Sequence, residues 1–440
     1  MGDNQHRHRQ QQHHQLPAPT TYDRFPKRHQ NTNEKQSRLA LNPGGESGRR
    51  GFHPSHFLRI NFRSTSRAST ICNLLWPFVP AALAVRYTME ERHILIFTLA
   101  YIAMVPCANL IGFAGQELAQ KLPRVIGMLT EITLGSVVEI VLFIVLLSKD
   151  YFNVIKAAIL GSILATMLLC LGFCFFVGGV CRTEQTFGGT ISETGHGLLF
   201  LAGVSLAVPT VFGQGIFETN LSGVELDDRT LQISRIISVL LIIAYAAYLF
   251  FTVTTHHGLY DASFAYDEHR DADKHEDARK AKLTMTECII ALLIAIPLVA
   301  IIAITLVLQI EHVIEVSNVS DAFMGLILVP LVEKFAEHLT AIDEAWDDQM
   351  NLALSHVLGA TLQTTLFNAP LTVVVAWGLG KQMDLNFDIF NLVMLILSIL
   401  TVGRFLQDGK SNYLEGLLLV LLYIAVAVSA WYYPNPTEGH

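Results

Sequence analysis

Long apolar segments follow one another through most of this 440-residue chain, and they constrain its fold more than any other feature. Most approach the roughly 20 residues that an α-helix needs to cross a bilayer. Charged residues make up only 15% of the chain, below the roughly 25% typical of soluble proteins. The sequence therefore predicts an all-α polytopic membrane protein with about 11 transmembrane helices. We place them at residues 71–88, 93–113, 125–147, 154–180, 197–214, 233–254, 286–310, 319–342, 352–377, 388–405 and 413–432.

The polar segments indicate how the chain is oriented. Residues 1–70 hold 12 Lys/Arg and four Asp/Glu and lack sustained apolar periodicity, which is typical of a disordered tail. Its basic excess favours the cytosolic side. The first apolar run begins near Ile71, too late for a signal peptide, so we expect none. Six crossings return the acidic, His-rich loop at 255–283 to the cytosol. Residues 433–440 form a short C-terminal tail.

The acidic loop divides the membrane part into two groups of five spans. One group covers residues 93–254 and the other 286–432, while the helix at 71–88 stands alone. Because five is odd, the second group passes through the membrane in the opposite orientation. Inverted repeats with a binding site at their interface are a recurring transporter design. The sequence therefore predicts a lone first helix followed by two inverted five-helix repeats.

One glutamate lies deep inside a predicted span of each group. Glu139 precedes Gly161 by 22 residues, and Glu337 precedes Gly359 by the same interval. A charged side chain at the centre of a membrane helix costs about 2.5–3.5 kcal/mol on insertion scales. Two such acids at matching places of a repeat are difficult to explain by packing. We therefore predict that Glu139 and Glu337 bind a cation together.

Two buried carboxylates suit a site that carries either a divalent cation or protons. Calcium takes 6–8 oxygen ligands, and two carboxylates neutralise its charge. When the ion leaves, the carboxylates are stranded in a low dielectric, which favours their protonation. This competition between ion and protons is what an antiporter requires. No cofactor is expected, because calcium and protons are the transported ions.

Five polar residues are candidates for supporting or proton-coupled roles: Ser136, Ser162, His338, Gln363 and Thr364. His338 adjoins Glu337, and an imidazole titrates near neutral pH; alternatively it is a neutral histidine bonded to the backbone. Ser162, Gln363 and Thr364 lie near the glycines that follow the two acids, where small residues permit close helix crossings. Each of these three could instead serve ordinary helix packing. The six cysteines show no spacing typical of a disulfide framework or a zinc site.

Several motifs resemble the calcium/proton exchangers of the calcium/cation antiporter superfamily, best known from vacuoles. The resemblance covers roughly residues 90–432 and implies an inverted-repeat helical bundle that moves cytosolic calcium into an acidic store, driven by protons. It also implies that Glu139 and Glu337 are the two essential acids. The matching motifs are Ala336-Glu337-His338, Leu366-Phe367, Pro370-Leu371, Met383-Asp384-Leu385-Asn386-Phe387, Leu406-Gln407-Asp408-Gly409, Leu160-Gly161-Ser162-Ile163-Leu164, Glu184-Gln185-Thr186-Phe187 and Ala244-Tyr245-Ala246-Ala247-Tyr248.

The chain departs from the exchangers at four positions near the acids. The exchangers have the sequence Gly-Asn-Ala-Thr-Glu-Leu around the first acid and Gly-Asn-Ala-Ala-Glu-His around the second. Here Ser136 and Lys334 replace the two asparagines, and Glu333 replaces the second glycine. A third asparagine of the family, eight residues before the first acid, is here Glu131.

These departures predict an unusual composition for the site. Glu131 and Glu139 are about two helical turns apart and would share a face of a continuous helix. Glu333 and Glu337 are four apart and would also share a face. We therefore expect a site with four carboxylates and one lysine. A lysine without a partner is costly inside a membrane, so Lys334 is expected to form a salt bridge with Glu333 or Glu337.

Three functions remain open from the sequence. The first is calcium/proton exchange across an organelle membrane, the vacuolar one by resemblance. The second is sodium or potassium/proton exchange on the same fold, which Lys334 and the lost asparagines favour. The third is a transport-silent relative that acts as a sensor. An enzyme is not expected, because the spans contain no Asp-Asp pair, His-Glu-x-x-His or nucleophile motif. The expected partners are calcium, protons and lipid, without nucleic acid; the oligomeric state stays open.

Overall fold

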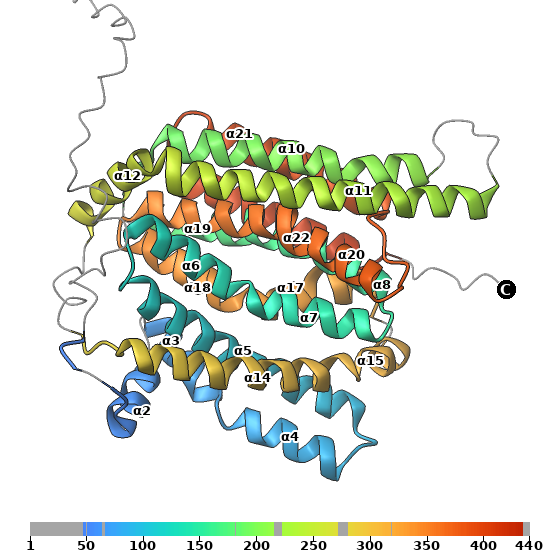
Figure 1. Cartoon of the computed structure of the whole chain (residues 1–440), viewed down its shortest axis with the longest axis horizontal. Helices are drawn as coiled ribbons and strands as arrows, with labels where there is room; N and C mark the ends of the chain where they lie inside the picture. Colours follow the sequence, from blue (N-terminus) through green and yellow to red (C-terminus); the bar gives the residue numbers. More distant parts are fainter. Residues whose placement is uncertain are drawn as a thin grey trace, which may run out of the picture. The chain divides into compact units, whose positions relative to one another are not determined.

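The computed structural model describes residues 47–49, 51–63, 67–180, 182–214, 222–271, 280–317 and 319–433. The described chain is predominantly helical (Figure 1). Within these residues the strands are two short segments, β1 (Gln185–Thr186) and β2 (Lys410–Ser411), which pair antiparallel. The expected all-α fold is therefore confirmed.

The first half of the fold contains the helices that follow the N-terminal part of the chain. Helix α5 covers a complete predicted span without interruption, whereas the next two spans are divided into consecutive helices. The elements are α5 (His93–Ala119), α6 (Arg124–Gly135), α7 (Val137–Ser148), α8 (Phe152–Leu164), the π-helix η3 (Ala165–Cys170), α9 (Leu171–Val180), α10 (Gly189–Gly213), α11 (Gly223–Phe250) and the π-helix η4 (Phe251–Thr255).

The second half shows the same tendency towards long helices interrupted by π-helical turns. Its elements are α14 (Met285–Val307), α15 (Ile310–Ser317), α16 (Asp321–Phe323), the π-helix η5 (Met324–Leu328), α17 (Val329–Glu333), α18 (Phe335–Trp346), α19 (Met350–Gln363), the π-helix η6 (Thr364–Asn368), α20 (Ala369–Gly378), α21 (Ile389–Leu406) and α22 (Tyr413–Trp431). Helix α14 packs along α5, and α10 packs against both α19 and α21 (Figure 1).

Among the described residues, nine helical stretches are long and apolar enough to cross a membrane. They correspond to nine of the eleven predicted spans. The span predicted at 71–88 is divided into α3 (Arg67–Cys72), the 3₁₀ turn η2 (Asn73–Leu75) and α4 (Phe78–Thr88). An 11-residue helix such as α4 is only about 17 Å long, shorter than a bilayer core. The span predicted at 319–342 is divided into α16, η5, α17 and α18. The total of eleven stays a prediction.

The two halves break a helix at matching positions. Helices α6 and α7 meet at Ser136, and α17 and α18 meet at Lys334. Each break lies three residues before the acid of its half, Glu139 or Glu337. Discontinuous helices of this kind frame the binding sites of inverted-repeat transporters.

A backbone feature repeats as well. Asp150 and Asp348 are the non-glycine residues with positive φ in the part of the chain that the structure describes, at 63° and 68°. Each follows the acid of its half by 11 residues and lies two residues beyond the end of the short helix that carries this acid. Non-glycine residues seldom adopt this conformation. Its recurrence at corresponding positions supports the predicted internal repeat.

A close crossing holds the two halves together next to these breaks. A Cβ atom added to Gly161 on α8 would lie 2.2 Å from the carbonyl oxygen of Leu326 on η5. On the other side of the same contact, one added to Gly325 would lie 2.5 Å from Cβ of Ala157. A larger side chain at either glycine would separate α8 from η5. The small residues therefore permit backbone contact between the halves.

Several outer helices expose wide apolar faces. In the stretches Gly223–Thr255, which includes α11, and Tyr413–Trp431, which is α22, only 28% of the most hydrophobic 18 residues are buried inside the protein. Their exposed side chains include Leu240, Ile243 and Leu421. Apolar surface of this extent is typical of helices that contact lipid rather than water.

Part of the segment predicted as a disordered tail is helical. Residues Pro54–Arg63 form α2, whose Phe57 and Ile60 side chains are buried. Just before it, the backbone N–H of His53 donates to Glu287 Oε1 at 3.1 Å. The disorder predicted up to residue 70 is therefore wrong for α2, because its apolar side chains and a buried glutamate fix it in place. Most of the tail, residues 1–46, lies outside the described residues.

The predicted acidic loop also contains a helix, α12 (His257–Arg270). Asp267 attaches it to α19 by accepting hydrogen bonds from Asn351 Nδ2 at 2.7 Å and from the backbone N–H of Leu352 at 2.9 Å. Burial raises the pKa of Asp267 to about 6, although these hydrogen bonds oppose the shift. Residues 272–279 of the loop lie outside the described residues.

Candidate cation site

Each predicted acid lies in the first turn of a helix that starts at a break. Glu139 occupies the first turn of α7, and Glu337 the first turn of α18. The N-terminus of a helix carries partial positive charge and unpaired N–H groups, which favour a carboxylate there. Both acids thus gain from the breaks at Ser136 and Lys334. Glu139 is completely buried, and the Glu337 side chain retains 14% exposure.

Glu139 accepts hydrogen bonds from both halves of the protein. Ser162 Oγ on α8 donates to Oε1 at 2.8 Å. Thr364 Oγ1 lies 3.0 Å from Oε1 and 2.8 Å from Oε2, and Asn368 Nδ2 donates to Oε2 at 2.7 Å. Thr364 and Asn368 lie at the two ends of η6, and π-helical turns are frequent at functional sites. Ser162 and Thr364, predicted as supporting residues, therefore do contact the first acid.

Lys334 lies between the two acids. Its Nζ is 2.8 Å from Glu139 Oε2 and 3.1 Å from Glu337 Oε2, and the lysine is completely buried. The predicted salt bridge with Glu337 is present, and the second one, with Glu139, was not anticipated. A single ammonium group thus joins carboxylates from both repeats.

Glu333 is the third acid of this centre. It is 1% exposed, and neither of its carboxylate oxygens accepts a hydrogen bond from the described residues. The break at Lys334 interrupts the continuous helix on which Glu333 and Glu337 were expected to share a face. An ionised carboxylate buried in this way is costly, so the geometry favours a protonated Glu333 in this state.

The other predicted supporting residues do not hydrogen-bond to either acid in the described structure. Ser136 Oγ donates to the Ile132 carbonyl oxygen of its own helix at 3.1 Å. His338 Nε2 lies 3.3 Å from Thr166 Oγ1. Gln363 is buried, and its Oε1 has no hydrogen-bond partner among the described residues.

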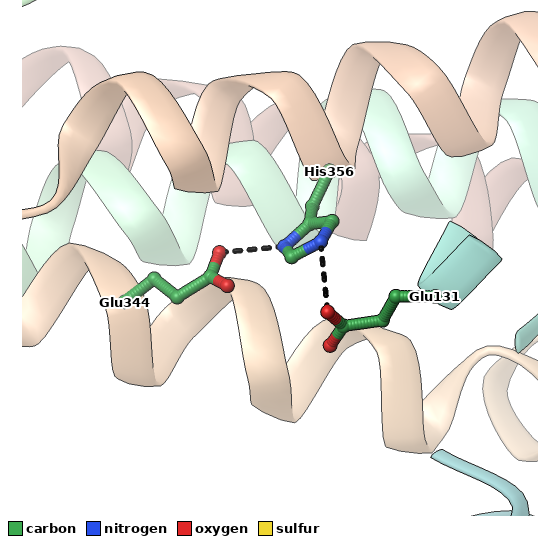
Figure 2. A group of neighbouring side chains, drawn as sticks. All are labelled: Glu131, Glu344 and His356. Carbon is green, nitrogen blue, oxygen red and sulfur yellow. Dashed lines mark hydrogen bonds and ion pairs between the residues drawn. The ribbon is translucent and has the colours of Figure 1, made fainter. Parts of the chain in front are cut away.

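Glu131 does not join Glu139 as expected. The break at Ser136 lies between them, so the two-turn spacing does not apply. Instead Glu131 Oε2 lies 3.6 Å from His356 Nε2, and His356 Nδ1 lies 2.7 Å from Glu344 Oε2 (Figure 2). The expected group of four carboxylates and a lysine is therefore wrong: three carboxylates surround or adjoin the lysine, and the fourth belongs to a separate cluster.

Sequence reasoning missed three residues of these two clusters. Asn368 was not considered, although an amide inside an apolar segment is a signal of a buried hydrogen bond. His356 was overlooked as well, although a histidine inside an apolar segment is a similar signal. Glu344 belongs to an acidic group close to the end of the span predicted at 319–342, where sequence alone does not distinguish a solvated side chain from a buried one; it is 8% exposed. A cavity connects the clusters, and Glu131, His356, Glu333, Glu337 and His338 are among the residues that line it.

The chain matches the family model described as sodium/calcium exchanger protein at residues 92–254 and 288–432. It is 35% identical over 368 residues to the vacuolar cation/proton exchanger 2 of Arabidopsis thaliana, covering 83% of this chain and 82% of that protein. It is 30% identical over 454 aligned positions to the vacuolar calcium ion transporter of Cryptococcus neoformans, covering 84% of this chain and 75% of that one.

A solved structure is similar as well. The crystal structure of the selenium-substituted Ca²⁺/H⁺ antiporter protein YfkE matches with a TM-score of 0.68 and 26% identity, covering 84% of this chain and all of that one. The two matched segments of the family model coincide with the halves that contain Glu139 and Glu337.

Proposed function

Because this chain belongs to the sodium/calcium exchanger protein family, we propose that it exchanges calcium for protons across an organelle membrane by alternating access. Relatives named as a vacuolar cation/proton exchanger and a vacuolar calcium ion transporter support the vacuolar membrane as its location. The basic excess of residues 1–70 supports a cytosolic N-terminus. In this proposal Glu139 and Glu337 bind the cation or protons in turn.

The observation that carries the proposal is the position of Lys334. Its ammonium group is held between Glu139 and Glu337 at 2.8 and 3.1 Å. A buried place that holds an ammonium between two carboxylates has the charge and geometry to hold a free cation. Lys334 therefore acts as a tethered cation that an incoming ion must displace.

The charges of the centre fit a divalent ion in spite of the lysine. If Glu333 gives up its proton when the cation binds, the three carboxylates of Glu139, Glu333 and Glu337 together with the Lys334 ammonium carry a net charge of −2. A centre with only two glutamates has the same charge. The two substitutions at 333 and 334 relative to the family motif thus compensate each other, and a calcium ion remains neutralised.

Exchange follows from the cost of burying an unpaired charge. A carboxylate that loses its partner inside the protein is strongly destabilised. When a divalent cation leaves, Lys334 returns between Glu139 and Glu337 but neutralises only one of the three carboxylates, so the remaining two negative charges must be neutralised by protons. Ser162, Thr364 and Asn368 orient Glu139 through hydrogen bonds that come from both halves.

A monovalent substrate is the second candidate, and Glu333 is the residue that favours it. If Glu333 keeps its proton, the centre with Lys334 in place carries a net charge of −1. Sodium or potassium would neutralise that charge, whereas calcium would leave an excess. The protonation of Glu333 therefore separates the two candidates.

The test is ion flux in proteoliposomes that contain the purified chain and an acidic interior. We expect uptake of radioactive calcium that depends on the pH gradient and is abolished by Glu139→Gln or Glu337→Gln. Glu225→Gln is the matched control, since Glu225 is an exposed acid at the start of α11 and should leave uptake unchanged.

Competing ions decide between the candidates. Proton release on addition of sodium or potassium, without calcium uptake, would support the monovalent exchanger. Absence of flux with every ion, in protein shown to be folded, would contradict transport and support the sensor. Inhibition of calcium uptake by calcium analogues but not by sodium or potassium would support the divalent exchanger.

A further inference from the structure

We propose that Glu131 and His356 bind a divalent transition-metal ion, with Glu344 orienting the histidine ring. This cluster is separate from the acids bridged by Lys334. The proposal does not rest on calcium exchange, because binding of a metal can be measured without flux.

The three residues come together from three helices. Glu131 lies on α6, Glu344 on α18 and His356 on α19 (Figure 2). One potential ligand atom from each residue lies within 4.8 Å of the others. The Nε2 of His356 is 3.6 Å from Glu131 Oε2. Donors around a tetrahedral ion with bonds near 2.1 Å are about 3.4 Å apart, so this pair needs little movement to share an ion.

The opposite nitrogen of the ring is already engaged. Nδ1 of His356 lies 2.7 Å from Glu344 Oε2. In metal sites the histidine usually donates its second N–H to a carboxylate, which fixes the tautomer and directs the free nitrogen at the metal. The same contact here directs Nε2 towards Glu131.

That nitrogen lacks a hydrogen-bond partner although it is enclosed. His356 is 7% exposed, and its Nε2 makes no hydrogen bond with the described residues. Buried polar atoms are normally satisfied. Glu131 and His356 both line the cavity described above, which leaves space beside them for an ion.

The chemistry of the donors selects the class of metal. Calcium and magnesium prefer sites made of oxygen alone. An imidazole nitrogen with carboxylate oxygens suits zinc, cobalt, iron or manganese. Glu131 and Glu344 together supply the two negative charges that a divalent ion requires. The ligand is therefore a divalent transition metal, and calcium should compete poorly.

The test uses the purified full-length chain in detergent, titrated with Co²⁺, whose visible absorption reports nitrogen and oxygen ligands. His356→Gln and Glu131→Gln should remove the site, and Glu344→Gln should weaken binding by about 10–100-fold. The matched control is Glu337→Gln, which changes the other cluster and should retain Co²⁺ binding. The histidines of residues 1–70 are present in every variant, so they cancel in the difference from the unsubstituted chain.

A variant that gains a new absorption band shows that loss of Co²⁺ binding in the other variants is not due to misfolding alone. In His356→Cys, a thiolate replaces the nitrogen and should add a sulfur-to-cobalt charge-transfer band that excess calcium does not remove. The proposal is overturned if the unsubstituted chain and His356→Gln bind Co²⁺ equally and His356→Cys shows no new band. Loss of binding in Glu337→Gln equal to that in His356→Gln would also overturn it, by assigning the metal to the central acids.

Discussion

Lys334 Nζ lies 2.8 Å from Glu139 Oε2, although the two residues belong to opposite halves of the chain. The contact makes the lysine a competitor for any ion that uses Glu139. It also makes Glu139 dependent on the break between α17 and α18, where Lys334 is located.

Replacing Lys334 by asparagine should raise the apparent affinity for calcium about tenfold or more, since removing a competitor worth 1.4 kcal/mol changes affinity tenfold. The measurement is the concentration dependence of calcium uptake in proteoliposomes. The control is Lys381→Asn, which removes a lysine that pairs with the exposed Asp150 instead. Unchanged affinity, or complete loss of uptake, would contradict the role of Lys334 as a displaceable cation.

Thr364→Val should lower both calcium uptake and the thermal unfolding midpoint. The hydroxyl that it removes donates to Glu139, and a hydrogen bond to a charged group contributes about 1.5–3 kcal/mol. Thr365→Val is the matched control, because the hydroxyl of this buried threonine donates to the Thr361 carbonyl oxygen of the same helical stretch. Equal effects of the two substitutions on uptake would argue against a specific role of Thr364.

Gly135→Ala should reduce uptake strongly with little loss of stability. A Cβ atom at this position would lie 2.5 Å from Glu337 Oε1 and 2.8 Å from its Cγ, so the flexible end of the glutamate must move away. Gly197→Ala is the control, since a Cβ there has no neighbour within 4 Å. Uptake rates and unfolding midpoints of both variants check the prediction; normal uptake by Gly135→Ala would show that the position of Glu337 is not critical.

Asp267 should make the stability of the folded chain depend on pH. Because its pKa is raised to about 6 from an ordinary 3.8, the folded state binds more protons than the unfolded state between these values. Its contribution to stability is therefore largest below about pH 4 and falls as pH rises to about 6. At neutral pH, above this pKa, the ionised form predominates, and burial makes it less favourable in the folded state than in the unfolded state.

Asp267→Asn does not titrate and removes this dependence. Between pH 4 and pH 6, the unfolding midpoint of the variant should rise relative to that of the unsubstituted chain. Above pH 6 the difference between the two midpoints should stay constant. Thermal unfolding in detergent across this range is the measurement. Asp261→Asn, which changes a partly exposed aspartate of the same helix, serves as the control. A difference that does not change with pH would contradict the assignment to Asp267.

The sequence contained enough information to predict the acids and the repeat. Charge inside apolar spans is costly, so Glu139 and Glu337 stand out by composition alone, and their equal distances to Gly161 and Gly359 indicate two copies of one unit. Ser162 and Thr364 could be anticipated as polar groups close to those glycines. Their functional roles remain predictions.

The errors about which acids share the site have one physical cause. Side-chain spacing was interpreted on continuous helices, but the chain breaks at Ser136 and Lys334. A break redirects the residues on one side of it, so Glu131 contacts His356 rather than lying beside Glu139. Apolar periodicity cannot reveal such breaks, because the residues on both sides remain hydrophobic. Contacts between distant segments, such as Asn368 with Glu139, are likewise absent from local patterns.

The tether of Lys334 sets an effective concentration that the cell does not control. A group attached next to its binding partner competes as if it were present at millimolar concentration or above, on the order expected for short linkers. Cations in solution must compete with this effective concentration of the Lys334 ammonium to occupy the place between Glu139 and Glu337. The calcium concentration that gives half-maximal transport should therefore be set by competition with the Lys334 side chain. Changes in the potassium concentration should hardly alter it.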